Sequence, residues 1–141
     1  MNNANPFRTM SPADRRAAAV AACVAARAAS EPLWAQEIAA KAAGDAAALE
    51  RIQAELAEIG KGWKVASRAA VVTWAATCPD GTVMTRRSDN AYSHAVVLKS
   101  NGKWAATFHH DAKLAGKAAQ QRRRYYAGPV EIHVVETTII K

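Results

Sequence analysis

Histidines are concentrated in residues 85–111 of a chain of 141 residues. His94 and His109 flank Asn101-Gly102, a dipeptide that favours a two-residue type I′ turn between antiparallel strands. The register of such a hairpin places His94 opposite His109, with Cβ atoms ~5 Å apart. Two adjacent imidazoles can ligate zinc or transfer protons. Because catalytic zinc usually takes three protein ligands, we expect no metal at this candidate pair and interpret it as two half-exposed histidines on a sheet face.

The same stretch contains the residue types of a hydrolytic triad, Ser93, His94 and Asp111. No nucleophile elbow and no oxyanion donor accompany them in the sequence. We therefore expect no catalytic residue and no cofactor. A small metal- or histidine-dependent enzyme, which would also use His110 and His133, is the third of three functional interpretations.

Positive charge is concentrated in the second half of the chain. Residues 1–60 contain six Lys and Arg and seven Asp and Glu, which gives a net charge of −1. Residues 61–141 contain 13 Lys and Arg and five Asp and Glu, which gives a net charge of +8. Such asymmetry favours contact with a polyanion, nucleic acid above all. The candidate contact residues are Arg86, Arg87, Lys113, Lys117, Arg122, Arg123, Arg124 and Tyr125.

A basic helix is predicted from its N-cap, Asp111, to about Tyr126, and Gly128-Pro129 is expected to end it. Spacings of four, four and three place one set of polar side chains on a single face of this helix. That face contains Lys113, Lys117, Gln121 and Arg124. The neighbouring face, expected to pack on the sheet, contains Leu114, Ala118 and Tyr125. A basic helical face beside aromatic residues, Tyr125, Tyr126 and Trp104, suits phosphate contacts combined with some base or ribose stacking.

The N-terminal half is rich in alanine and predicts two or three antiparallel helices. Ser11 is the expected N-cap of a helix that runs to about Ala29, and Ser30 is the expected N-cap of the next helix. A further helix begins near residue 45 and is expected to end at Gly60. It carries an apolar stripe, for which packing within the domain is the favoured interpretation and a homodimer seam the alternative. The stripe consists of Leu49, Ile52, Leu56 and Ile59.

Alternating β-branched and aromatic residues in the second half predict an antiparallel sheet. Strands are expected at 70–78, 82–87, 92–100, 103–110 and 130–140. The basic helix lies between the last two, so the order is ββββαβ and the fold class is α+β, mainly an antiparallel meander. Trp104 and Phe108 mark the core side of the hairpin. We expect a loose leader at 1–10, a helical segment at 11–60 and a basic β-rich segment at 61–141, packed as one domain or as two small subdomains.

Residues 85–119, about a quarter of the chain, resemble a stretch found in short phage proteins of unknown function. The matching residues are Arg86, Arg87, Ser88, Tyr92, His94, Val96, Val97, Leu114 and Ala115. Ser93 departs conservatively from the threonine usual in that stretch. The resemblance implies a mobile-element origin and a small accessory protein that acts on a host system. It supplies no catalytic residues.

The leading functional interpretation is a small, non-enzymatic basic module that contacts nucleic acid, or a host nucleoprotein complex, through its C-terminal half. The alternative is a phage protein that inhibits a host defence complex, for example an anti-CRISPR protein, by direct protein binding. The two cysteines, Cys23 and Cys78, lack metal-type or redox-type spacing, which suits a reducing compartment. No apolar run approaches the ~20 residues that span a bilayer. We therefore expect no membrane contact and a location in the cytoplasm of a bacterial host.

Overall fold

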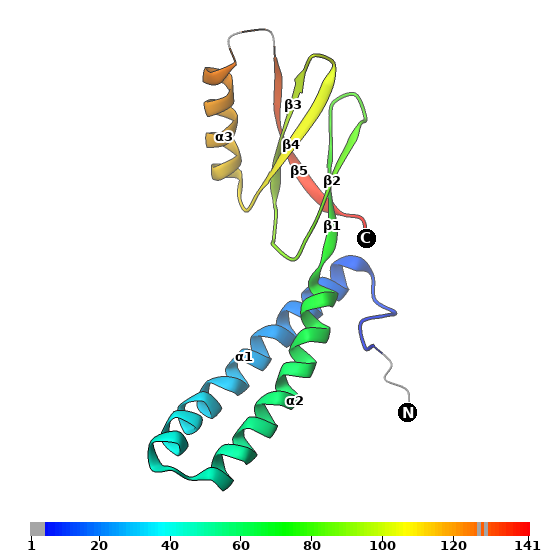
Figure 1. The fold of residues 1–141 in the computed structure, drawn as a ribbon. Helices are drawn as coiled ribbons and strands as arrows, with labels where there is room; N and C mark the ends of the chain where they lie inside the picture. Colours follow the sequence, from blue (N-terminus) through cyan, green and yellow to red (C-terminus); the bar gives the residue numbers. More distant parts are fainter. Residues whose placement is uncertain (1–4, 127, 129) are drawn as a thin grey trace. The chain divides into compact units, whose positions relative to one another are not determined.

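The computed structural model describes residues 5–126, 128 and 130–141. The chain divides into two compact units, Met1–Ala70 and Val71–Lys141, and each is described by itself. Within the described residues the elements are two N-terminal helices followed by four strands, a third helix and a fifth strand. The predicted α+β class and the order ββββαβ are therefore confirmed (Figure 1).

The first unit is an antiparallel hairpin of two helices, α1 (Pro12–Ala43) and α2 (Ala46–Ala70). Ser11 is the N-cap of α1, as predicted, and its hydroxyl both accepts from the Asp14 backbone N–H and donates to the Asp14 carboxylate. Gly44 ends α1 in the left-handed conformation, at φ 67°, and Asp45 then accepts from the Ala48 backbone N–H at the start of α2. Local capping therefore sets the turn of the hairpin.

The predicted break at Ser30 is wrong, because α1 continues through Ser30 and Pro32. Ser30 is only 3% exposed, and its hydroxyl donates to the Ala26 carbonyl, four residues back, over 2.8 Å. A serine hydroxyl inside a helix can form its hydrogen bond with the carbonyl four residues back, so a serine is compatible with a helix interior as well as with an N-cap. Burial of Ser30 therefore selects the continuous helix over the capped one.

The predicted end of the helical segment at Gly60 is also wrong, because α2 continues ten residues further to Ala70. Ala66, Ala69 and Ala70 are buried in a small core with Ala19 of α1. This packing extends the helix through a glycine that would otherwise favour a stop, since tertiary contacts override weak local preferences. The strand predicted at 70–78 begins two residues later, at Val72, and ends at Thr77.

The leader expected at 1–10 is not loose in its described part. Phe7 is buried against Ala19 and the end of α2, and a turn that includes the Arg8 N–H to Asn5 carbonyl bond supports it. Residues 1–4 lie outside the described residues. The hydrophobic side chain of Phe7 thus joins the helical core that alanine alone would leave thin.

The second unit is a five-stranded antiparallel sheet with the spatial order β2-β1-β5-β3-β4. Its elements are β1 (Val72–Thr77), β2 (Val83–Ser88), β3 (His94–Ser100), β4 (Lys103–His109), α3 (Ala112–Tyr125) and β5 (Glu131–Ile139). The first part of β5 pairs with β3 and its last part with β1, so this strand joins the two hairpins into one sheet. The stop expected at Gly128-Pro129 cannot be described in full, because Pro129 lies outside the described residues.

The hairpin register predicted from Asn101-Gly102 is confirmed, with His94 opposite His109. Both turn residues have positive φ, 52° at Asn101 and 75° at Gly102, as a type I′ turn requires. Because side chains alternate along a strand, this register also decides which residues face the core.

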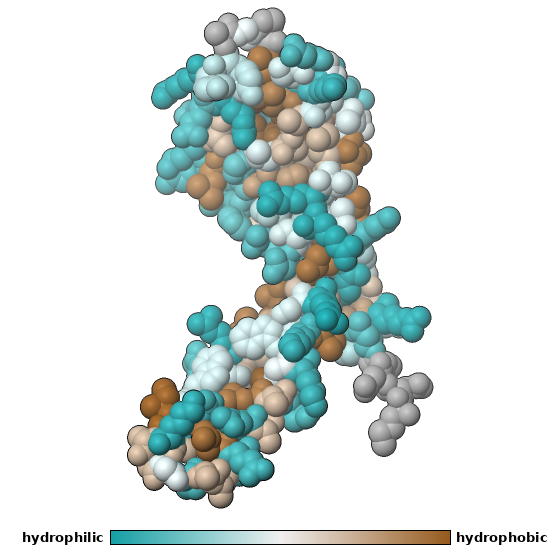
Figure 2. Space-filling view, viewed as in Figure 1, coloured by the Kyte–Doolittle hydropathy of each residue, from teal (hydrophilic) through white to brown (hydrophobic). Residues whose placement is uncertain are grey.

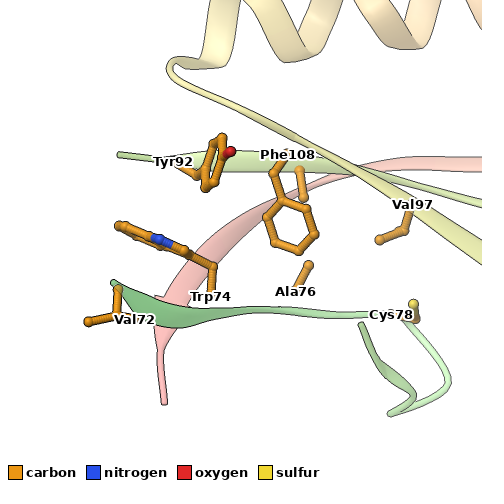
Figure 3. Packing of buried hydrophobic residues seen from close by; sticks show 8 residues of the cluster. Val72, Trp74, Ala76, Cys78, Tyr92, Val97 and Phe108 are labelled. Carbon is orange, nitrogen blue, oxygen red and sulfur yellow. The ribbon is translucent and has the colours of Figure 1, made fainter. Parts of the chain in front are cut away.

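The main core lies on the face of β3 and β4 that carries Phe108, as predicted. Trp74 from β1 meets the ring of Tyr92 edge-on at 5.7 Å, and Tyr92 meets Phe108 at 5.6 Å (Figure 3). Trp104 packs partly buried at the edge of this cluster. The opposite face is covered by α3, where Ala115 and Ala119 pack against Val96 and Ile132. In this unit α3 therefore rests on β3, β4 and β5.

The continuous helix gives contrasting expectations for two serines. Ser30→Ala should change the free energy of unfolding of the helical unit by less than about 0.5 kcal/mol, because the Ala26 carbonyl keeps its backbone partner. Ser11→Ala should cost about 1 kcal/mol, because it removes a real N-cap. Urea titration followed by helical circular dichroism compares the two variants. A cost at Ser30 equal to that at Ser11 would contradict the buried, back-bonded serine.

Candidate nucleic-acid interface

Helix α3 is held on the sheet by its smallest side chains. Asp111 caps it by accepting from the Leu114 backbone N–H over 2.8 Å. Ala115 and Ala119, one turn apart, are buried against the sheet. The predicted packing face was displaced by one residue, because Leu114 is 44% exposed and Ala115 takes the buried position. Alanine lets the helix backbone approach the strands closely, which a leucine at the contact would prevent.

The outer side of α3 carries the polar face predicted from spacing. These side chains lie opposite Ala115 and Ala119 on the helix, and all are exposed; we call them the basic ridge. The basic ridge consists of Lys113, Lys117, Gln120, Gln121 and Arg124. Gln120 was missed, although its spacing of three from Lys117 and four from Arg124 would have identified it. Figure 2 shows hydrophilic side chains covering this part of α3.

The cations of the basic ridge have no acidic partner among the described residues. Ion pairs found among the described residues lie elsewhere: two are within α1 and one is within α2. A fourth, between His133 and Glu131, is within β5. No described carboxylate comes within 4.0 Å of the side-chain nitrogens of Lys113, Lys117, Arg123 or Arg124. The charge of these groups is therefore available to an external anion.

Arg122 points inward instead of joining the ridge. Its Nη1 donates to the Thr107 hydroxyl on β4 over 2.8 Å, and that hydroxyl lies 3.0 Å from Nε2 of His109. Burial, and then the Arg122 guanidinium, lower the pKa of His109 below its ordinary value of 6.5. Because Thr107 accepts from Arg122, its own hydrogen is free to be donated to the Nε2 of a neutral His109. Arg122 therefore anchors α3 and is removed from the candidate contact set.

The histidine pair is occupied by neighbouring hydroxyls. Ser93 donates its hydroxyl hydrogen to the His110 carbonyl over 3.0 Å, so the 2.8 Å contact to His94 must be a donation from Nδ1–H of His94. His109 is engaged with Thr107 on the other side. No group of three or more His, Cys, Asp or Glu side chains with metal-binding geometry occurs in the described part of the chain.

Arg86 and Arg87 do not form one patch with each other. They are consecutive on β2, so their side chains point to opposite faces of the sheet. Arg86 pairs with Trp74 and lies over the ring of Tyr92 at 5.4 Å, on the core side. The ring of Tyr92 also stacks with His110 at 5.6 Å. The strand predicted at 82–87 already contains both arginines, so alternation along it would have separated them.

The basic residues at the tip of the β3–β4 hairpin are partly compensated. Lys99 lies over the Trp104 ring at 5.5 Å, and Trp104 Nε1 donates to the Asp80 carboxylate over 2.9 Å. This hydrogen bond, together with donation from Thr82 and the charge of Lys99, lowers the pKa of Asp80 to about 2. Asp80 is thus ionised at any ordinary pH and offsets the charge of Lys99.

The corrected boundary also changes the division of charge. Lys61, Lys64 and Arg68 belong to α2 and not to the β-rich unit. The helical unit then has nine Lys and Arg against seven Asp and Glu, a net charge of +2, and the β-rich unit has ten against five, a net charge of +5. The unit that carries the basic ridge therefore has a smaller net positive charge, +5, than the +8 of residues 61–141, but this charge is concentrated in fewer residues.

The inward arginine predicts a selective change at His109. Arg122→Gln should raise the imidazole pKa of His109 toward 6.5 while keeping a donor for Thr107, and Arg123→Gln should not, because Arg123 is exposed. Since the folded pKa of His109 is lower than its ordinary value of 6.5, the unfolded chain binds the proton first as the pH falls below about 6.5, and stability falls with it. NMR titration of the imidazole measures the shift. An unchanged pKa of His109 in the Arg122→Gln variant would contradict the contact of Arg122 with Thr107 and His109.

Comparison of the chain with models of protein families, with curated proteins and with solved structures gave no match in any of the three. In the part of the chain that the structure describes, no helix is both long and apolar enough to cross a bilayer. The geometry of α3 is therefore the basis on which a function can be argued.

Proposed function

We propose that the protein is a non-enzymatic binding module that contacts nucleic acid through the basic ridge of α3. The observation that carries this proposal is the set of exposed cations without acidic partners on one side of a helix whose other side is anchored to the sheet. A rigid helix presents these charges without a large loss of backbone freedom on binding. Arg123 and Tyr125 flank the ridge and extend it.

The length of the basic ridge suits several consecutive phosphates. Lys113 and Arg124 are eleven residues apart, which corresponds to about 16 Å along the helix. This distance equals about five base-pair steps of duplex DNA at 3.4 Å each. Lysine and arginine contacts to phosphate release condensed counterions, which makes such binding favourable and dependent on salt but not on base sequence.

An aromatic side chain next to the ridge supports contact with unpaired bases as well. Tyr125 is 83% exposed at the end of α3, and its ring meets that of Tyr126 edge-on at 5.3 Å. An exposed ring beside arginines is the arrangement on which a base can stack while its phosphates are neutralised. The preferred ligand is therefore single-stranded nucleic acid, whose bases are accessible.

Inhibition of a host defence complex by direct protein binding is the second candidate. Leu114 and Tyr125 are both exposed on the same flank of α3, and an apolar flank beside arginines is typical of protein interfaces. The resemblance of residues 85–119 to short phage proteins supports a phage origin for such an inhibitor. The free thiols of Cys23 and Cys78 suit a reducing compartment such as the bacterial cytoplasm. A partner protein retained after nuclease treatment of a bacterial lysate favours this candidate. Loss of all partners on nuclease treatment favours nucleic acid.

The role of the basic ridge can be tested by comparing two variants that each lose three positive charges, one on the ridge and one elsewhere in the same unit. The triple variant Lys113→Gln, Lys117→Gln, Arg124→Gln should bind duplex DNA more weakly, with the slope of log affinity against log salt reduced by about 2.7. The control triple variant Lys99→Gln, Lys103→Gln, Lys141→Gln removes the same charge from the same unit and should reduce the slope by less than about 1. Gel-shift or fluorescence titrations over a range of salt concentrations give both slopes. Equal losses in the two variants, or no binding by the unmodified protein, would sink the proposal.

Tyr125 offers a separate measure of base contact. Tyr125→Ala should weaken binding to single-stranded DNA by about 1–3 kcal/mol, while Tyr125→Phe should retain the stacking surface and most of the affinity. Duplex binding should change little in either variant, because paired bases are not available for stacking. Fluorescence anisotropy with labelled single-stranded and duplex oligonucleotides separates the two effects. A loss in Tyr125→Phe equal to that in Tyr125→Ala would mean that the hydroxyl, and not the ring, makes the contact.

A further inference from the structure

A line of apolar side chains on α1 has no partner within the helical hairpin. Its members, which we call the α1 stripe, are Val20, Val24, Trp34 and Ile38, and they are 37%, 65%, 43% and 71% exposed. At 100° per residue, all four fall within an arc of about 80° on the helix surface. Figure 2 shows hydrophobic side chains at the surface of the hairpin near its closed end. Four large apolar groups on one face are more than the single exposed side chains that need no explanation.

The hairpin uses a different side of α1 for its own packing. The buried residues of α1 are Ala19, Ser30 and Ala40; Ala19 and Ser30 lie about a quarter of a turn away from the α1 stripe, and Ala40 lies further round the helix. The apolar stripe of α2, for which a homodimer seam was the alternative interpretation, packs within the hairpin instead. Ile52 is buried, and the other members are half-buried: Leu49, Leu56 and Ile59. Of the two apolar stripes, the one left exposed for a partner is therefore that of α1.

The α1 stripe is symmetric about Ala29 in sequence. Val20 and Ile38 are nine residues before and after Ala29, and Val24 and Trp34 are five residues before and after it. Arg27 and Glu31, two residues before and after Ala29, lie at the centre of the same face with side chains 71% and 63% exposed. Reversing the direction of the helix thus places an apolar residue on an apolar residue and a base on an acid.

We propose that α1 pairs antiparallel with α1 of a second copy of this chain, across a two-fold axis at the level of Ala29. In this pairing Val20 packs against Ile38 of the second copy, and Val24 packs against its Trp34. Arg27 lies opposite Glu31 of the second copy, and by symmetry this ion pair occurs twice. A two-fold interface requires such self-complementarity, because the same patch is used on both subunits.

Charge selects the antiparallel direction. A parallel pairing would place Arg27 against Arg27 and Glu31 against Glu31, and like charges in contact oppose association. Within one copy the two side chains already form an ion pair of 3.7 Å across one turn, so both heads lie at the level of the proposed axis. The contact from residue 20 to 38 is about 27 Å long, and it buries a tryptophan, the residue type most often found at the centre of strong interfaces.

Charge reversal tests the pairing without removing apolar surface. Sedimentation equilibrium of the full chain, freed of nucleic acid, should show a dimer. Arg27→Glu and Glu31→Arg should each raise the dimer dissociation constant by roughly tenfold or more, because both ion pairs then become contacts between like charges. An equimolar mixture of the two variants should form a heterodimer about as tight as the original, since each reversed charge meets its opposite. A monomeric original protein, or a mixture no tighter than its parts, would overturn the proposal.

Two further variants test the place and the direction of contact. Val24→Glu should abolish the dimer, and Ala25→Glu should not, because Ala25 is exposed away from the α1 stripe. In a Cys23→Ala background, oxidation of Val24→Cys mixed with Trp34→Cys should give the mixed disulfide in preference to either symmetric one. Symmetric Val24→Cys disulfides would show a parallel pair and contradict the inference. None of these measurements involves nucleic acid, so their outcome is independent of the basic ridge.

Discussion

Packing through alanine is the constraint on which the rest of this structure depends. An alanine side chain buries little area, so a contact built from alanines stabilises only when the backbones come close. Among the described residues this solution is used at Ala19 with Ala66 in the hairpin and at Ala115 and Ala119, where α3 packs on the sheet. On α1 and α3 the buried faces are narrow, and larger side chains such as Trp34, Ile38 and Leu114 are left outside, whereas α2 also buries Ile52. The basic ridge and the α1 stripe are both consequences of this division.

Alternation along β4 explains why His109 lies in the contact between the sheet and α3. Phe108 faces the aromatic core, so Thr107 and His109 must face α3, where they meet the inward Arg122. A neutral His109 is the protonation state that suits a half-buried position beside a guanidinium. Arg122 in turn ties the end of α3 to the sheet, which keeps the outward cations on the opposite side of the helix. Of the histidines that first suggested chemistry, His109 is therefore part of the contact that holds the end of α3 on the sheet.

Features governed by local geometry could be predicted from the sequence, and features governed by burial could not. The turn at Asn101-Gly102 requires positive φ at both residues, so the register of the hairpin followed from two residues alone. Ser30 is compatible both with a cap and with a helix interior, and only its burial decides between them. The ridge followed from helical spacing, but the buried face did not, because hydrophobicity favours Leu114 where close approach requires alanine. Arg86 and Arg87 could also have been separated from the sequence, because the strand predicted at 82–87 contains both and alternation places them on opposite faces.

The two proposed surfaces have a joint consequence that neither has alone. A dimer through α1 carries two basic ridges, so binding to a long polyanion becomes bivalent, with an effective concentration set by the connection between the ridges. One ridge spans about five base-pair steps, and a short oligonucleotide can engage only one ridge of a dimer. Affinity should therefore rise steeply once a strand is long enough to reach both ridges, and this rise should vanish when Arg27 or Glu31 is reversed. Dimerisation would then set the length of nucleic acid that the protein prefers, while α3 sets the chemistry of contact.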